Sequence, residues 1–245
     1  MTKLSVNVNK VATLRNTRNL GIPGIVHASR LCLDAGAHGI TVHPRPDARH
    51  IRPSDVYEVA AMLKEYPEAE YNIEGNPFPD YMEYARVLRP AQCTLVPDAH
   101  DAFTSNEGWN LEREGERLRP IIATLKSYGC RVSLFMDALT PHLEIAAELG
   151  ADRIELYTEP YAAAFAQGNG AAEVERFAET AREAAKRGLG INAGHDLNLE
   201  NLPLFAGSLP ELLEVSIGHA LIADALEFGL GDTVRRYRAA LTVRG

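Results

Sequence analysis

The sequence has no long apolar run, and this absence excludes several classes of protein. No stretch approaches the roughly 18 apolar residues that a membrane-spanning helix needs. The first ten residues, MTKLSVNVNK, lack the apolar core of a signal peptide. We therefore expect a cytoplasmic protein that makes no membrane contact.

Cysteine is also scarce, with only three residues of this type. Cys32, Cys93 and Cys130 are an odd number, lie far apart and show no CxxC spacing. This pattern argues against a disulfide framework and against a zinc knuckle. We expect the three residues to be buried thiols.

Positive charge is outnumbered, because 25 Lys and Arg residues face 33 Asp and Glu residues, for a net charge of −8 at pH 7. An acidic chain has no field that attracts a polyanion, so a nucleic-acid partner is not expected. A small phosphate can still be held by a few local arginines and backbone N–H groups.

The remaining composition, 46% hydrophobic and 24% charged over 245 residues, is that of an ordinary globular protein. Short β-branched runs alternate with longer helical stretches, which indicates repeated βα units. The predicted strands are Leu4–Val8, Gly39–His43, Glu70–Glu74, Gln92–Val96, Arg131–Met136, Arg153–Tyr157, Gly190–Ala193 and Leu213–Ile217. The predicted helices cover about 25–36, 54–66, 79–88, 111–128, 140–149, 171–188, 199–206 and 219–240.

Eight βα units in a chain of this length predict a closed parallel (β/α)8 barrel, and no linker divides residues 1–245 into two domains. The alternative is an open doubly wound sheet. Such a sheet would carry a GxGxxG or phosphate-binding loop after its first strand, where this chain reads VNVNKVATLRN. We favour the barrel.

A barrel enzyme has its active site at the C-terminal ends of the strands, and here those ends are polar. The residues at or just beyond these ends are Asn7, Asn9, His43, Arg45, Glu74, Asp137, Glu155, His195, Gly218 and His219. His50 and His100 also fall in loops at this edge, whereas His27, His38 and His142 lie in or beside helices. We assign the first set to the site and the second to structure.

Two turns and two basic loops indicate phosphate binding. INAGHDLN and SIGHALIA follow strands seven and eight, where such barrels hold phosphate on backbone N–H groups. The first loop carries Arg15 and Arg18, and the second carries Arg45, Arg49 and Arg52. We expect Arg49 and Arg52 to be solvated. The segment 97–110 is long enough to close over a substrate, with Phe103 and Trp109 to anchor it.

Five segments resemble those of one enzyme family. VNVNKVATLRNTR, GITVHPRPDARHI, NIEGNP, INAGHDL and SIGHALI are similar to motifs of pyridoxine 5′-phosphate synthase, in the same order along the chain. The resemblance implies a (β/α)8 barrel with extra helices, commonly a homo-octamer, without a cofactor or metal. It implies condensation of 1-deoxy-D-xylulose 5-phosphate with 3-amino-2-oxopropyl phosphate to pyridoxine 5′-phosphate, phosphate and water, in vitamin B6 biosynthesis.

The resemblance also implies roles for individual residues. The proton acceptors are His43 and Glu74, the proton donor is His195, and Glu155 stabilises the transition state. Residues implied for the amino-ketone phosphate are Asn7, Arg18, Asp196, Gly218 and His219. Residues implied for the sugar phosphate are Asn9, Lys10, Arg45, His50 and Thr104. Many members have Asp-His in place of Asn9-Lys10 and Gly in place of Asp196.

Two other functions are compatible with these residues. His43, Glu74 and His195, joined by Glu155 or Asp137, could instead bind a divalent metal in a sugar-phosphate isomerase or epimerase. A non-catalytic sugar-phosphate-binding regulator would need the phosphate turns but no acid–base set, so the presence of His43, Glu74 and His195 counts against it.

Overall fold

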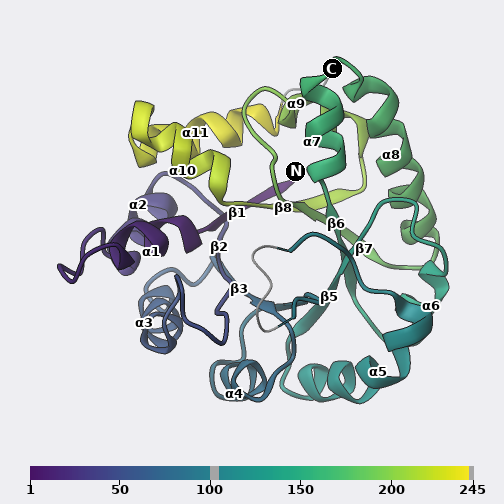
Figure 1. Cartoon of the computed structure of the whole chain (residues 1–245), viewed down its shortest axis with the longest axis horizontal. Coiled ribbons are helices and arrows are strands. Elements are labelled where there is room, and N and C mark those ends of the chain that lie inside the picture. Colours follow the sequence, from purple (N-terminus) through teal and green to yellow (C-terminus); the bar gives the residue numbers. More distant parts are fainter. Residues whose placement is uncertain (100–104, 243–245) are drawn as a thin grey trace.

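The chain folds around a closed barrel of parallel strands (Figure 1). A computed structural model describes residues 1–99 and 105–242. The strands are β1 Lys3–Asn7, β2 Gly39–Val42, β3 Glu70–Gly75, β4 Gln92–Leu95, β5 Arg131–Met136, β6 Arg153–Tyr157, β7 Gly190–Gly194 and β8 Leu212–Ile217. They pair in sequence order, and β8 pairs with β1 to close the barrel, for example through Leu4 and Val215.

Helices surround the barrel in Figure 1 and cover the outer faces of its strands. They are α1 Asn9–Asn16, α2 Ile25–Asp34, α3 Pro53–Leu63, α4 Pro79–Leu88, α5 Leu111–Ser127, α6 Leu143–Glu148, α7 Glu159–Ala166, α8 Gly170–Lys186, α9 Leu202–Ser208, α10 His219–Phe228 and α11 Leu230–Ala240. Within the described ranges, none of them is both long and apolar enough to cross a membrane.

The predicted barrel is confirmed, and the predicted strands agree with the observed ones within one residue at each end. The helices agree less well. The predicted helix 219–240 is two helices, because Gly229 has φ 77° and interrupts the helix between α10 and α11. Helices α1 and α7 are not predicted from the sequence, and the predicted helices that correspond to α6 and α9 begin about three residues too early.

Most of the strands alternate between apolar and polar residues, although β5 ends in three apolar residues, Leu134, Phe135 and Met136. The apolar residues, such as Ile73 and Leu95, are fully or almost fully buried and belong to the main hydrophobic core. The alternate residues are polar and face the barrel interior, where they bond across strands: Thr94 Oγ1 donates to Asn72 Oδ1 at 3.1 Å, and Gln92 Nε2 donates to Glu214 Oε1 at 3.2 Å. Branched aliphatic side chains usually fill such an interior.

The three cysteines are free and buried, as the sequence analysis predicts. The histidines assigned to structure lie outside the cavity described below. His38 Nδ1 accepts a hydrogen bond from Leu4 N at 3.0 Å, and His142 pairs with Glu112 and Glu144 on the surface.

Candidate active site

A cavity of about 530 Å³ opens at the C-terminal ends of the strands. It brings together all the site residues that the family resemblance implies except Arg18 and Thr104. Those that line it are Asn7, Asn9, Lys10, His43, Arg45, His50, Glu74, Glu155, His195, Asp196, Gly218 and His219. Arg18 is exposed in the segment after α1, and Thr104 lies outside the described residues, as do His100 and Phe103.

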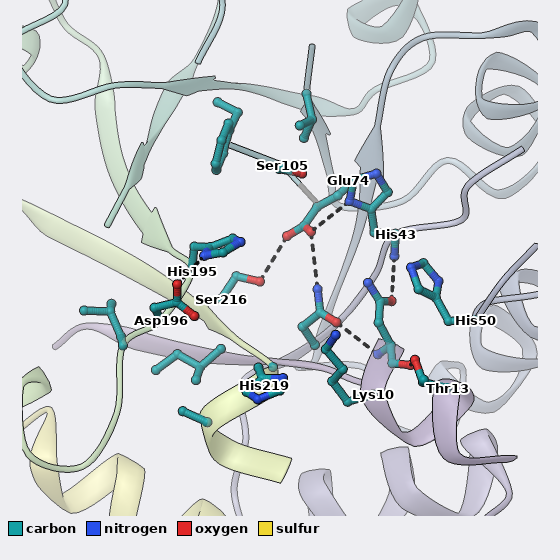
Figure 2. Close-up of a pocket in the computed structure, with 18 of the residues that line it drawn as sticks. Lys10, Thr13, His43, His50, Glu74, Ser105, His195, Asp196, Ser216 and His219 are labelled. Carbon is teal, nitrogen blue, oxygen red and sulfur yellow. Dashed lines mark hydrogen bonds and ion pairs between the residues drawn. The ribbon is translucent and has the colours of Figure 1, made fainter. Parts of the chain in front are cut away.

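Glu74, near the end of β3, stands at the centre of this cavity (Figure 2). Its carboxylate accepts hydrogen bonds from Ser216 Oγ at 3.0 Å, from Asn7 Nδ2 at 3.3 Å and from Asn72 Nδ2 at 3.4 Å. Burial disfavours the charged form and raises the pKa of Glu74 to about 7. The group can therefore gain and lose a proton near neutral pH.

Glu155, on β6, is the second carboxyl group of the cavity floor, and it is 3% exposed. Its Oε2 accepts a hydrogen bond from Thr94 Oγ1 at 3.4 Å. Burial raises the pKa of Glu155 well above its ordinary value, and the charges of Glu74 and Glu214 raise it further. One of two such neighbouring carboxyl groups tends to keep a proton.

His43 follows β2 and lies beside Glu74, with 3.8 Å between His43 Nδ1 and Glu74 Oε2. Asn9 fixes the backbone of this histidine, because its Oδ1 accepts from His43 N at 3.0 Å. Burial, together with the positive charge of Arg45, holds the pKa of His43 well below its usual value. The ring is therefore neutral at pH 7 and able to accept a proton.

His50 and Arg45 form one wall of the cavity. The pKa of His50 falls to about 4 through burial and the charges of Arg45 and Lys10. Because His50 Nδ1 accepts a hydrogen bond from Ile51 N at 2.8 Å, the neutral ring carries its proton on Nε2. Arg45 Nη2 pairs with Asp98 Oδ2 at 2.6 Å.

His195 lies across the cavity from His43, with Glu74 between them (Figure 2). His195 and Asp196 both have positive φ, 83° and 54°, a conformation that glycine adopts without strain. The Asp196 carboxylate lies 2.9 Å from His195 Nδ1, and this contact lowers the pKa of Asp196. Thr158 Oγ1 donates to the carbonyl groups of Gly194 and His195 and holds the turn.

The start of α10 forms the end of the cavity opposite to Arg45 and His50. Gly218 caps this helix and His219 is its first residue, so the first backbone N–H groups of α10 face the pocket. A Cβ on Gly218 would lie 3.2 Å from the Asn7 backbone oxygen, so a larger residue would press on β1. This is a suitable place for a phosphate group.

The other basic residues of the first two loops differ in position. Arg15 is buried and pairs with Asp55, and its Nη2 also donates to the carbonyl oxygen of His50 at 3.1 Å, so it supports the second loop. Arg49, predicted to be solvated, is 31% exposed and pairs with Asp47 at the surface, but it also lines the cavity. Arg52 is exposed, as predicted.

The segment after β4 is docked on the barrel where the structure describes it. Trp109 is 3% exposed, and its Nε1 donates to Leu95 O at 2.8 Å. Asp137, a predicted strand-end candidate, does not line the cavity; its Oδ1 accepts from Gly108 N at 3.1 Å and so helps to fix this segment. Whether the segment closes over substrate stays a prediction.

Two residues that contact side chains of the site were not predicted from the sequence. Asp98 follows β4, and its carboxylate contacts Arg45, His43 and Ser105. Ser216, on β8, donates to Glu74. The signal for Asp98 was its place directly after a strand, and the signal for Ser216 was its alternation with Glu214 on the inward face of β8.

A metal-dependent isomerase or epimerase would need a cluster of metal ligands, and the described part of the chain shows none. Across residues 1–99 and 105–242, no three His, Cys, Asp or Glu side chains are arranged to hold a metal ion.

Solved structures similar to this chain share its fold. One is a tryptophan synthase from M. tuberculosis, with a TM-score of 0.66 and 12% identity, covering 100% of this chain and 93% of that one. Another is a phosphoribosylanthranilate isomerase from Thermotoga maritima, with a TM-score of 0.59 and 13% identity, covering 98% of both chains. Both likenesses concern the barrel alone.

Much closer sequence relatives cover nearly the whole chain. The "Pyridoxine 5′-phosphate synthase" of Albidiferax ferrireducens is 55% identical over 241 residues, 96% of either chain. Proteins of the same name from Xanthomonas campestris pv. campestris and Xylella fastidiosa are 53% identical over 98% of this chain and 54% identical over 96% of it, covering 96% and 93% of those proteins. The family model described as "Pyridoxal phosphate biosynthesis protein PdxJ" matches residues 4–243. The chain therefore belongs to the PdxJ family.

Proposed function

We propose that this chain is a pyridoxine 5′-phosphate synthase, an enzyme of vitamin B6 biosynthesis. It would condense 1-deoxy-D-xylulose 5-phosphate with 3-amino-2-oxopropyl phosphate to give pyridoxine 5′-phosphate, phosphate and water. The observation that carries this proposal is the gathering, in one cavity of a PdxJ-family chain, of Glu74 with a histidine on either side.

The reaction suits an enzyme without a cofactor. One substrate brings an amine and the other a ketone, so an imine forms between them without an enzyme lysine. The remaining steps are proton transfers, eliminations and a ring closure, which need groups that exchange protons near pH 7. We propose that no cofactor or metal takes part.

His43 and Glu74 are proposed as the proton acceptors. The lowered pKa of His43 keeps its ring neutral, and the pKa of Glu74, about 7, lets this group accept a proton in one step and return it in another. Their separation, 3.8 Å between Nδ1 and Oε2, lets both groups reach one bound intermediate.

His195 and Glu155 are proposed as the proton donor and the transition-state stabiliser. The Asp196 carboxylate lies 2.9 Å from His195 Nδ1 and holds the ring through that nitrogen, so Nε2 is the nitrogen left to donate a proton to a departing oxygen. Glu155 lines the cavity and is almost fully buried, so its carboxyl group can interact with positive charge or donate a hydrogen bond to a bound intermediate.

The two phosphate groups are assigned to opposite ends of the cavity. At the α10 end, the amino-ketone phosphate would contact Asn7, Gly218 and His219, with the backbone of Asp196 nearby and Arg18 supplied by the segment after α1. At the β2 end, the sugar phosphate would contact Asn9, Lys10, Arg45 and His50. Thr104, which lies outside the described residues, is proposed as a further contact on the family resemblance alone. Asn9 is held through its own backbone N–H, which donates to Asn7 Oδ1 at 3.0 Å.

We further propose that residues 1–245 form one catalytic domain, that the chain assembles as a homo-octamer, and that it works in the cytoplasm. Large apolar side chains are exposed around the end of α1 and on α10, where a second copy could cover them: Leu14, Leu20, Ile22 and Leu226. Free buried cysteines agree with a reducing compartment. Light scattering of the purified chain measures the oligomeric state.

The test of the activity is incubation of the purified protein with both phosphorylated substrates. We expect an absorbance increase from pyridoxine 5′-phosphate, and none when either substrate is left out. A correctly folded protein that forms no product would contradict the proposal.

A further inference from the structure

Asp98 connects two of the proposed site residues to the segment that follows β4. Its Oδ2 lies 2.6 Å from Arg45 Nη2 and 3.5 Å from His43 Nε2, and it accepts a hydrogen bond from Ser105 Oγ at 2.8 Å. All four side chains are less than 10% exposed. A shielded carboxylate that faces a guanidinium and an imidazole interacts strongly with both.

The backbone of Asp98 is itself held in place. Asn76, just after β3, donates from Nδ2 to Asp98 O at 3.0 Å, and Asn76 Oδ1 accepts from Arg117 Nη2 on α5 at 3.0 Å. The carboxylate therefore sits on a fixed support rather than on a free loop. Asp98 does not line the 530 Å³ cavity, so its side chain acts on the site from behind His43 and Arg45.

His43 has a carboxylate near each ring nitrogen, Glu74 at Nδ1 and Asp98 at Nε2. A neutral imidazole carries one proton, and the partner of one nitrogen decides which nitrogen holds it. Glu74 exchanges its own proton near pH 7, whereas Asp98 is paired with a permanent cation. The proton of His43 is therefore expected on Nε2, which leaves Nδ1 facing Glu74 and the substrate as the acceptor.

We propose that Asp98 is a positioning residue of this enzyme, which fixes the Nε2–H tautomer of His43. The expected effect on kcat rests on the proposed function. The structural consequence, the tautomer of His43, is measurable in the ligand-free protein.

The test compares Asp98→Ala with the wild type, with Asp98→Glu as the conservative variant and Asp80→Ala as a matched control. Asp80 is an exposed carboxylate at the start of α4 that does not line the 530 Å³ cavity. We expect kcat of Asp98→Ala to fall by about 10–100-fold, the range for losing the group that orients a proton-transfer residue, while KM for the sugar phosphate changes by less than about fivefold. Asp98→Glu recovers part of kcat, and Asp80→Ala equals the wild type.

Nitrogen NMR with ¹⁵N-labelled histidine supplies the second readout, with the His43 signals assigned by their loss in His43→Gln. The wild type is expected to show the proton on Nε2, and Asp98→Ala a mixture of both tautomers. An unchanged tautomer in Asp98→Ala overturns the inference, even where kcat falls, because the effect would then come from the support of the segment after β4. A changed tautomer with unchanged kcat also overturns it.

Two further outcomes are separable. If Asp98→Ala does not fold, the isosteric variant Asp98→Asn replaces it, and we expect the same fall in kcat and the same mixture of His43 tautomers. If the wild type forms no product, the proposed function fails, while the tautomer comparison still decides whether Asp98 positions His43.

Discussion

Glu155 occupies the space that a side chain at position 194 would need. A Cβ on Gly194 would lie 2.5 Å from Glu155 Oε1 and 3.1 Å from Ser216 O. The small residue in the INAGH turn therefore does more than let the chain reverse direction. It leaves room for a carboxyl group of the neighbouring strand at the floor of the cavity.

Gly194→Ala should displace the Glu155 carboxyl group and lower kcat. The backbone at 194 does not have positive φ, so the change acts through this contact rather than through backbone strain. Steady-state kinetics measure the effect, and Gly24→Ala is the control because a Cβ there would meet only an ordinary contact, 3.8 Å from His27 Cβ. Equal kcat in the two variants would show that Glu155 need not keep its place.

Glu74→Gln should keep the fold and lower turnover by about 10²–10⁴-fold, because glutamine has the same shape but cannot take up a proton. The pH profile gives an independent check. Since the pKa of Glu74 is about 7, kcat/KM of the wild type should rise as pH passes through this value, and the residual activity of Glu74→Gln should lack that rise. Unchanged turnover would leave Glu74 a structural role only.

The same variant should become more stable, relative to the wild type, as pH rises. The folded protein binds the Glu74 proton more tightly than the unfolded chain, with a pKa of about 7 against 4.5. The stabilisation is thus complete below about pH 4.5 and is lost as pH rises through 7. Between pH 4.5 and 8, Glu74→Gln should gain about 3 kcal/mol in free energy of unfolding over the wild type, as measured by urea denaturation. A pH-independent difference would contradict the raised pKa.

Arg45→Met should weaken binding of the sugar phosphate by about 1.5–3 kcal/mol, the usual value of a charge-assisted hydrogen bond. The amino-ketone phosphate should bind as before, because its proposed contacts lie at the α10 end of the cavity. Calorimetry with each ligand alone decides, and Arg52→Met is the matched control in the same loop, since Arg52 is exposed and off the cavity. Equal losses for both ligands would reject the assignment of the two phosphates.

Activity should survive exhaustive chelation, because the proposed proton transfers use side chains and no metal. The variant His195→Asn should abolish ring formation, while the amino-ketone phosphate should still bind to it. Asparagine has no titrating group to protonate a departing oxygen, whereas Gly218, His219 and the α10 backbone remain in place. Activity lost on chelation and restored by one equivalent of a divalent metal would instead favour the metal-dependent isomerase alternative.

The barrel could be predicted because most strands are short runs with β-branched residues and the alternation of strand and helix repeats eight times. The positions of His43, Glu74, Glu155 and His195 followed, since parallel strands all end at one edge. The helix α1 was missed because NKVATLRN is polar, with only Val11, Ala12 and Arg15 buried, so its apolar periodicity is weak.

Other features of the site depend on contacts between distant segments. Arg15 and Arg18 lie in the same polar stretch after β1, and the sequence does not distinguish their roles. In the structure, Arg15 is buried against Asp55 and Arg18 is exposed. The role of Asp98 depends on the approach of β2 and the segment after β4, and local patterns carry no information about that approach.

The most direct test of the proposed function is a stoichiometric product assay with both substrates and the wild-type protein. Pyridoxine 5′-phosphate is measured by its absorbance, and inorganic phosphate by a coupled assay, in the same reaction. We predict one equivalent of each for every pair of substrates consumed. Phosphate release without pyridoxine 5′-phosphate, or consumption of one substrate in the absence of the other, would contradict it.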